Sequence, residues 1–122
     1  MESTWLALYF ALKPGHEDEV EEIFKNSGRP AHNVLDDSGE VVGRLLRTMV
    51  FLGKEKAVRV IEVEGDILTV SRHMSRQDEV IQLEAKLDEH LAVARDMVTP
   101  EGAMQFFVEA GMRCVVNRTD HD

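Results

Sequence analysis

Three arginines lie in two stretches whose other residues are typical of apolar β-strands. Arg44 and Arg47 interrupt "GRLLRTMVF" (residues 43–51), and Arg59 interrupts "AVRVIEV" (residues 57–63). A guanidinium that faces an apolar cavity needs a carboxylate, a ligand anion or water, because an unpaired buried charge is unfavourable. The pattern therefore predicts one of two structures: a surface sheet with ion pairs, or a sheet that lines an anion-binding cavity.

The register of the hairpin between these two strands decides between the two structures. If Lys54 and Glu55 form a two-residue turn, Arg47 lies opposite Glu62, and Arg59 lies on the other face of the sheet. If the loop has three residues, both arginines share one face with the apolar side chains of Leu45, Met49, Phe51, Ile61 and Val63. The sequence leaves both registers open, as it leaves open whether the arginines pair with nearby glutamates or lie at the rim of the sheet.

Other side chains could contribute to the same site. His73 is a candidate acid or base because an imidazole exchanges a proton near neutral pH, although a histidine on an amphipathic helix is also a common packing residue. Trp5 and Tyr9 share one strand parity and could stack on an aromatic ligand or belong to the core. The candidate catalytic residues are Arg47, Arg59 and His73, and the candidate substrate contacts are Trp5, Tyr9, Met49, Phe51, Glu62 and Phe106.

Composition narrows the class of protein. The 122 residues are 43% hydrophobic and 30% charged, which predicts one globular domain over residues 1–122. A net charge of −9 disfavours binding to nucleic acid or to an anionic membrane. Cys114 is the only cysteine, so no disulfide can form within the chain. The apolar run from Trp5 to Leu12 is too short for a membrane span, and we expect a cytoplasmic protein.

Neither a metal nor an organic cofactor is expected. Glu62, Glu64 and Asp66 alternate in "EVEGD", but acids beside a hairpin usually form a solvated or ion-paired face rather than a cation site. No flavin or nicotinamide fingerprint is present.

Hydrophobic periodicity predicts the elements that position these residues. Residues 4–12 read as a strand buried on both faces, followed by a helix that stops at Gly28. A loop or short hairpin leads into the two strands of the arginine hairpin, at 41–52 and 56–64.

The second half of the chain is predicted to be largely helical. One helix begins after Gly65, and a second begins at Asp78, which would be its N-cap. Thr99 and Pro100 predict the start of a short helix, and residues 113–117 predict a last strand. The order β-α-β-β-α-β is that of an α+β, ferredoxin-like split βαβ fold.

The candidate strands carry apolar residues on both parities, so the sheet needs cover on both faces. Helices can cover one face. The simplest cover for the other face is a second subunit, which predicts a homodimeric α/β barrel.

Seven segments resemble those of a known family, and they run over nearly the whole chain: "LKPGHEDEVEEIF", "GEVVGRLLRTMVFL", "VRVIEVEGD", "VSRHMSRQDEV", "LEAKLDEHL", "RDMVTPEGAMQFF" and "MRCV". They resemble the SchA/CurD-like proteins, which are encoded with bacterial type II polyketide synthases for spore pigments and aromatic antibiotics. The resemblance implies a role in aromatic polyketide biosynthesis.

A more distant similarity concerns the arginines. The chain is similar to the tetracenomycin F2 cyclase group of dimeric α/β barrels, in which a cavity arginine follows a glycine by four residues, as Arg47 follows Gly43. With one inserted hairpin residue, Arg59 takes the place of a cavity histidine of that group. Ser27 takes the place of a second histidine, so both histidines are absent here.

These resemblances imply an enzyme that cyclises or aromatises a polyketide intermediate without a cofactor. Arg47 and Arg59 would stabilise enolate oxygens, and His73 would transfer protons. Two alternatives remain: a cofactor-independent anthrone-type monooxygenase on the same barrel, and a non-catalytic accessory protein that steers polyketide folding. The expected partners are the aromatic polyketide, a second copy of the chain and, transiently, an acyl carrier protein or another synthase component.

Overall fold

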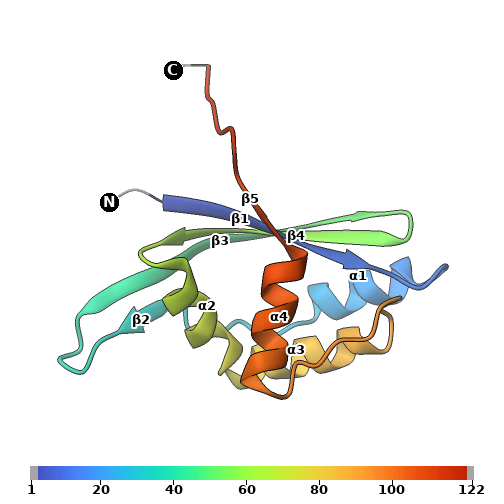
Figure 1. Cartoon of the computed structure of the whole chain (residues 1–122), viewed down its shortest axis with the longest axis horizontal. Helices are drawn as coiled ribbons and strands as arrows, with labels where there is room; N and C mark the ends of the chain where they lie inside the picture. The colour runs from blue at the N-terminus through green and yellow to red at the C-terminus, as the bar shows by residue number, and fades with distance from the viewer. Residues whose placement is uncertain (1–2, 121–122) are drawn as a thin grey trace.

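The computed structural model describes residues 3–120, which form an antiparallel sheet of five strands with four helices (Figure 1). The strands are β1 (Ser3–Ala11), β2 (Asn33–Leu35), β3 (Val41–Gly53), β4 (Lys56–Glu64) and β5 (Gly111–Arg113). The helices are α1 (Glu17–Lys25), α2 (Ile67–Ser75), α3 (Asp78–Asp88) and α4 (Pro100–Ala110). The predicted α+β class is confirmed. Within residues 3–120, no helix is both long enough and apolar enough to cross a bilayer.

The strand order is β2-β3-β4-β1-β5, and every neighbouring pair is antiparallel. β4 lies between β1 and β3, and β1 lies between β4 and β5, so each strand-helix-strand unit is split by a strand of the other unit. The short strand β2 extends one edge of this arrangement. The sheet is open, with β2 and β5 at its edges, so closure into a barrel with a second copy stays a prediction.

All four helices lie on one face of the sheet (Figure 1). One core cluster joins Leu8 and Phe10 of β1 to Val20 of α1 and Leu87 of α3. A second cluster lies under α2 and contains Val34, Leu45, Val63 and Val70. Burying each such apolar side chain contributes about 1.5–3 kcal/mol, so the helical face holds the sheet and the helices together.

The β3–β4 hairpin has the two-residue turn Lys54–Glu55, with Gly53 opposite Lys56. Glu55 adopts the left-handed conformation that such tight turns require, with φ 59°. Of the two registers that the sequence left open, the structure therefore has the one that places Arg47 opposite Glu62 and Arg59 on the other face. Farther from the turn, a β-bulge between Leu45 and Arg47 shifts the register by one residue.

Within one chain the first strand buries one face, with Leu8 and Phe10 buried, while Trp5 is half-buried and Tyr9 is exposed, so cover of the other face by a second copy stays a prediction. Two other expectations about the elements are wrong in detail. The last strand is β5 at residues 111–113 rather than 113–117, because Gly111 turns α4 directly into extended backbone. Gln77 rather than Asp78 is the N-cap of α3, which leaves Asp78 as the first helical residue.

Helix α2 begins at a glycine and an aspartate that perform different tasks. Gly65 has φ 95°, and a Cβ there would lie 2.8 Å from the Val42 carbonyl oxygen, so only glycine fits this position. Asp66 is the N-cap, and its Oδ2 accepts hydrogen bonds from Thr69 Oγ1 at 2.8 Å and Thr69 N at 3.0 Å. These hydrogen bonds hold the pKa of Asp66 below its ordinary value.

We expect Asp66→Ala to lower the free energy of unfolding by about 1 kcal/mol, because the substitution removes the acceptor that caps α2. Urea denaturation followed by circular dichroism measures this change. Asp37→Ala, in the exposed turn between β2 and β3, is the matched control and should leave the free energy of unfolding unchanged. Equal effects of the two substitutions would show that the cap contributes nothing.

Candidate functional site

The sheet face away from the helices, called here the open face, carries six of the nine predicted site residues. Residues directly opposite each other on antiparallel strands share a face. One cross-strand row consists of Arg47, Glu62 and Trp5, and the row two residues along consists of Met49, Val60 and Ala7. The third row consists of Phe51, Val58 and Tyr9. The six predicted residues on this face are Trp5, Tyr9, Arg47, Met49, Phe51 and Glu62.

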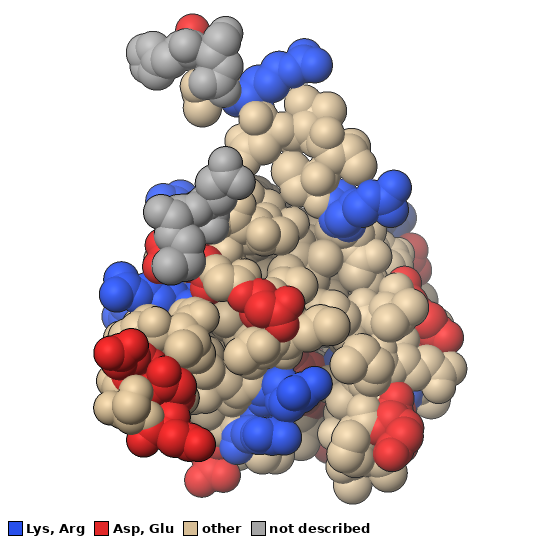
Figure 2. All heavy atoms as spheres, turned by 60° about the vertical axis from the view of Figure 1, so that its left-hand side comes forward, with Lys and Arg blue, Asp and Glu red and all other residues tan. Residues whose placement is uncertain are grey.

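The open face is apolar apart from its charged end. Tyr9 is 42% exposed and Phe51 is 58% exposed, in one row on either side of Val58, and two such exposed aromatic side chains on one sheet face are unusual. Beside them, a hollow of about 380 Å³ is lined by residues of β1, β4, β5 and the tail: Trp5, Leu6, Ala7, Val60, Met112, Arg113, Cys114, Val116 and Asn117. The surface just beneath the C-terminal tail is mostly uncharged, with acidic and basic groups around it (Figure 2).

Arg47 is an unpaired cation at one end of this apolar surface. It lies opposite Glu62, yet no carboxylate of residues 3–120 is within ion-pair distance of its guanidinium. Glu62 instead accepts a hydrogen bond from Ser3 Oγ at 2.8 Å. The neighbouring Arg44 pairs with Glu64, with 3.9 Å between Nε and Oε1. Among the described residues, the open face therefore presents the Arg47 guanidinium without an ion-pair partner, available to an anionic or polar ligand.

His73 lies in the helix layer, on the other side of the sheet from Arg47. Its Nε2 is 3.2 Å from the Ala31 carbonyl oxygen, to which a protonated Nε2 donates. Gln77 holds the same residue through Nε2 to the Ala31 carbonyl oxygen at 2.9 Å and through Oε1 to the Ala31 nitrogen at 2.7 Å. In this structure the contact between His73 and Ala31 links the segment before β2 to helix α2. His73 does not lie beside Arg47.

Arg59 belongs to a buried group of charges beneath the helices, called here the ionic cluster, which consists of Arg59, Glu84, Arg95 and Asp88. Arg59 Nη2 lies 2.6 Å from Glu84 Oε1, and Arg95 Nη2 lies 2.7 Å from Glu84 Oε2. Arg95 Nε donates to Asp88 Oδ1 at 2.7 Å. The side chains of Arg59, Glu84 and Arg95 are 13%, 10% and 6% exposed, whereas that of Asp88 is 41% exposed.

Phenylalanine rings surround the two guanidiniums of the ionic cluster. The Cζ atom of Arg59 is 5.3 Å from the ring centroid of Phe10, and that of Arg95 is 4.4 Å from the centroid of Phe106. The Phe10 and Phe106 rings are 5.6 Å apart. Cation–π attraction of this kind is stronger where water is excluded. The predicted site residues Arg59 and Phe106 therefore both lie at the ionic cluster, away from the open face, where Phe10 lies near each of them.

Glu84 is ionised in this setting. Burial alone would raise the pKa of its carboxyl group, but the positive charges of Arg59 and Arg95 and their hydrogen bonds outweigh burial, and the pKa is lowered. The carboxylate is the common counter-ion of both arginines.

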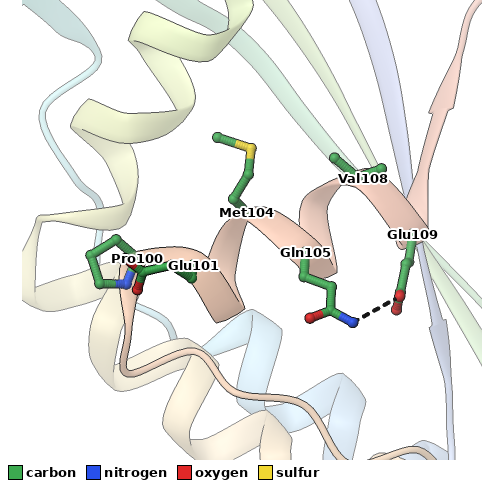
Figure 3. A pocket seen from close by; sticks show the side chains of 6 residues that line it. All are labelled: Pro100, Glu101, Met104, Gln105, Val108 and Glu109. Atoms are coloured by element: carbon green, nitrogen blue, oxygen red, sulfur yellow. Dashed lines mark hydrogen bonds between the residues drawn. The ribbon is translucent and has the colours of Figure 1, made fainter.

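A further hollow lies on the outer side of α4 (Figure 3). It has a volume of about 590 Å³ and is lined by Pro100, Glu101, Met104, Gln105, Val108 and Glu109. Its polar groups are partly engaged with each other, since Gln105 Nε2 donates to Glu109 Oε1 at 3.0 Å. It holds none of the predicted site residues.

Comparison with known proteins decides the family. Residues 3–120 match the family model described as the SchA/CurD like domain. The chain belongs to the SchA/CurD-like family. The resemblance predicted from its sequence segments is thus confirmed. No solved structure matches this SchA/CurD-like chain.

Three curated relatives of this SchA/CurD-like chain come from Streptomyces species. It is 41% identical to "Polyketide synthase CurD" of Streptomyces cyaneus over 109 residues, which is 89% of the chain. It is 37% identical to the "42.8 kDa protein in whiE locus" of Streptomyces coelicolor over 95% of the chain, and 36% identical to "Protein SchA" of Streptomyces halstedii over 89%. The chain spans only 27–28% of the length of these relatives.

Three residues of the ionic cluster, Glu84, Asp88 and Arg95, escaped the sequence analysis of this SchA/CurD-like chain. Glu84 lies four residues after Val80 and three before Leu87, so it is an acid on the apolar face of α3. That position was a usable signal, because a buried acid requires a cationic partner. Arg95 lies in the segment between α3 and α4, where no periodicity indicates which side chains turn inward.

Proposed function

We propose that this SchA/CurD-like protein is a cofactor-free cyclase or aromatase that acts on an aromatic polyketide intermediate at the open face. The observation that carries the proposal is the Arg47 guanidinium, which pairs with no carboxylate of residues 3–120 and lies at the end of an apolar, aromatic surface. A partly cyclised polyketide is flat and apolar, and its enolates are anionic. The three cross-strand rows offer a matching flat surface with one positive end.

Arg47 supplies electrostatic stabilisation in this proposal. When a methylene group of the substrate transfers a proton to the carboxylate of Glu62, which lies opposite Arg47, negative charge develops on the adjacent carbonyl oxygen, and a fixed guanidinium stabilises that charge without reorganisation. The enolate carbon then attacks a second carbonyl carbon of the same chain to close a ring, and the new alkoxide takes the proton back from Glu62. Trp5, Met49 and the aromatic row of Phe51 and Tyr9 hold the chain folded so that the two carbons lie close together.

A second copy of the chain covers the open face and excludes water from the substrate. An apolar sheet face with exposed Tyr9 and Phe51 supports this part of the proposal. The hollow beside Trp5 provides room for part of the substrate between the two copies. An acyl carrier protein or another synthase component would deliver the chain.

A non-catalytic accessory role is the second candidate. Within residues 3–120, His73, the predicted acid or base, lies across the sheet from Arg47. A protein that only binds the polyketide and favours one folded shape needs no such group.

The test is the product spectrum of a reconstituted type II synthase supplied with the wild-type protein or with Arg47→Met. If Arg47 stabilises the enolate, the substitution reduces the correctly cyclised product roughly ten- to hundredfold. Arg44→Met is the matched control, because Arg44 is a strand neighbour that already pairs with Glu64. An unchanged ring pattern with a folded Arg47→Met protein would refute the arginine mechanism.

Two further measurements separate the alternatives. Conversion of a carrier-free substrate by the purified protein alone, faster than the uncatalysed rate, supports an enzyme over an accessory protein. Oxygen uptake with an anthrone, above the uncatalysed rate, would instead support the cofactor-independent monooxygenase.

A further inference from the structure

Strand β5 ends although both it and its neighbour β1 have more chain to pair. The pairing stops where Leu6 lies opposite Arg113. Beyond that point β1 continues to Ser3, paired on its other side with β4, and the chain after Arg113 continues without regular structure. Among residues 3–120, two segments therefore lack a strand partner: the β5 side of Ser3–Trp5, called here the β1 edge, and residues 114–118, called here the C-terminal tail.

The C-terminal tail contains residues typical of a strand and leaves the sheet on the open face. Figure 1 shows it leaving β5 on the side of the sheet away from the helices. Val115 and Val116 are 76% and 60% exposed, and adjacent β-branched residues are typical of strands. Cys114, Val116 and Asn117 of the tail also line the hollow beside Trp5. The tail therefore borders the same surface that the proposed second copy covers.

A second copy on the open face would meet the C-terminal tail within its reach. Sheets that stack face to face lie about 10 Å apart. Five residues of extended chain span about 16–18 Å, so the tail is long enough to cross to the sheet of the other copy. Charge favours this contact, because Arg113 and Arg118 make residues 112–118 basic whereas the whole chain carries a net charge of −9.

We propose that each copy extends its C-terminal tail across the two-fold axis and pairs it, as an added strand, with the β1 edge of the partner copy. An unpaired strand edge presents a row of N–H and C=O groups, and the exchange gives these groups and those of the tail their partners. The inference rests on the second copy that covers the open face in the function proposed above.

The exchange would make each site a product of both copies. The β1 edge includes Trp5, which shares a cross-strand row with Arg47 and Glu62. A tail paired with this edge places the two valines of the partner copy beside the indole of Trp5. The partner copy then contributes apolar side chains to the wall of the site at its charged end.

The experiment detects contacts between copies directly. Chain labelled with ¹³C and ¹⁵N is mixed with an equal amount of unlabelled chain, and the copies are allowed to exchange. Isotope-filtered NOE spectra then show only contacts between a labelled and an unlabelled copy. We expect NOEs that join the methyl groups of Val115 or Val116 to Thr4 or Trp5 of the other copy.

Two outcomes would overturn the tail exchange, and light scattering tells them apart from failure of the dimer. One is a protein of twice the chain mass whose filtered NOEs involve Tyr9 and Phe51 but neither valine; the open-face dimer would then stand without the exchange. The other is a set of valine NOEs to Thr4 or Trp5 that arise only within one copy. A wild-type mass of one chain would refute the dimer, and the exchange with it.

Proline substitutions test whether the C-terminal tail pairs through its backbone. Successive N–H groups of a strand point to opposite sides, so only one of Val115 and Val116 donates to the partner copy's β1 edge. We expect one of Val115→Pro and Val116→Pro to weaken association roughly ten- to hundredfold, because each dimer loses the hydrogen bond twice. The other should act like its alanine counterpart, Val115→Ala or Val116→Ala. Equal effects of the two prolines, or none from either, would contradict an added strand.

Discussion

Glu84→Gln is expected to lower the free energy of unfolding at pH 7 by about 3–5 kcal/mol. The substitution removes the carboxylate that pairs with both Arg59 and Arg95, and it leaves two buried guanidiniums without their common counter-ion. For a domain of this size, whose total stability is about 5–15 kcal/mol, the loss is a large share. Urea denaturation followed by circular dichroism measures it.

Two substitutions in the same region serve as controls. Asp88→Asn changes the half-exposed member of the ionic cluster, and its effect should be smaller because the amide oxygen can still accept from Arg95 Nε and Glu84 remains as the counter-ion of Arg95. Glu89→Gln changes an exposed side chain at the end of α3 and should have no measurable effect. If Glu84→Gln proved as mild as Glu89→Gln, the ionic cluster would not hold α3 to the sheet.

The pH dependence of stability provides an independent check on Glu84. Its pKa in the folded protein lies below the ordinary value of 4.5, so the native state binds the proton less readily than the unfolded state does. The stabilisation is therefore fully present above about pH 4.5 and is lost as the pH falls through the folded pKa. The Glu84→Gln protein lacks this component, so its stability curve should be flatter than that of the wild type in this acidic range.

Local sequence patterns were sufficient to predict the order of the elements. The strand-to-helix changes after residue 12 and at Gly65 follow from a switch in hydrophobic period, and Thr99 and Pro100 mark the start of α4. Thr99 Oγ1 accepts from Gly102 N at 3.1 Å, as expected of an N-cap. Such signals involve residues close in sequence, which is why they could be read without the structure.

The register and the ionic cluster depend on contacts that local patterns do not encode. Nothing in "GRLLRTMVF" marks the bulge between Leu45 and Arg47, and Glu55 occupies a turn position where asparagine or glycine is the usual signal. The two-residue turn alone places Arg47 and Arg59 on opposite faces, and the bulge shifts only the part of β3 that precedes Arg47. Arg59, Glu84 and Arg95 come from β4, α3 and a connecting segment, so only the tertiary fold brings them together.

Phe51→Lys is expected to dissociate the proposed dimer. Phe51 is 58% exposed on the open face, so the substitution should leave the folded chain intact, which circular dichroism checks. In a two-fold symmetric interface each substitution occurs twice, and losing about 2 kcal/mol at each copy weakens association roughly a thousandfold.

Light scattering coupled to size-exclusion chromatography at micromolar concentration tests this proposal. The wild type should show about twice the chain mass of 13.8 kDa, and Phe51→Lys should show the mass of one chain. Val108→Lys, on the outer side of α4 and 69% exposed, is the matched control and should remain dimeric. Dissociation by Val108→Lys but not by Phe51→Lys would move the interface to α4. A wild-type mass of one chain would leave the open face uncovered and end the barrel proposal, because nothing would then exclude water from a substrate beside Arg47.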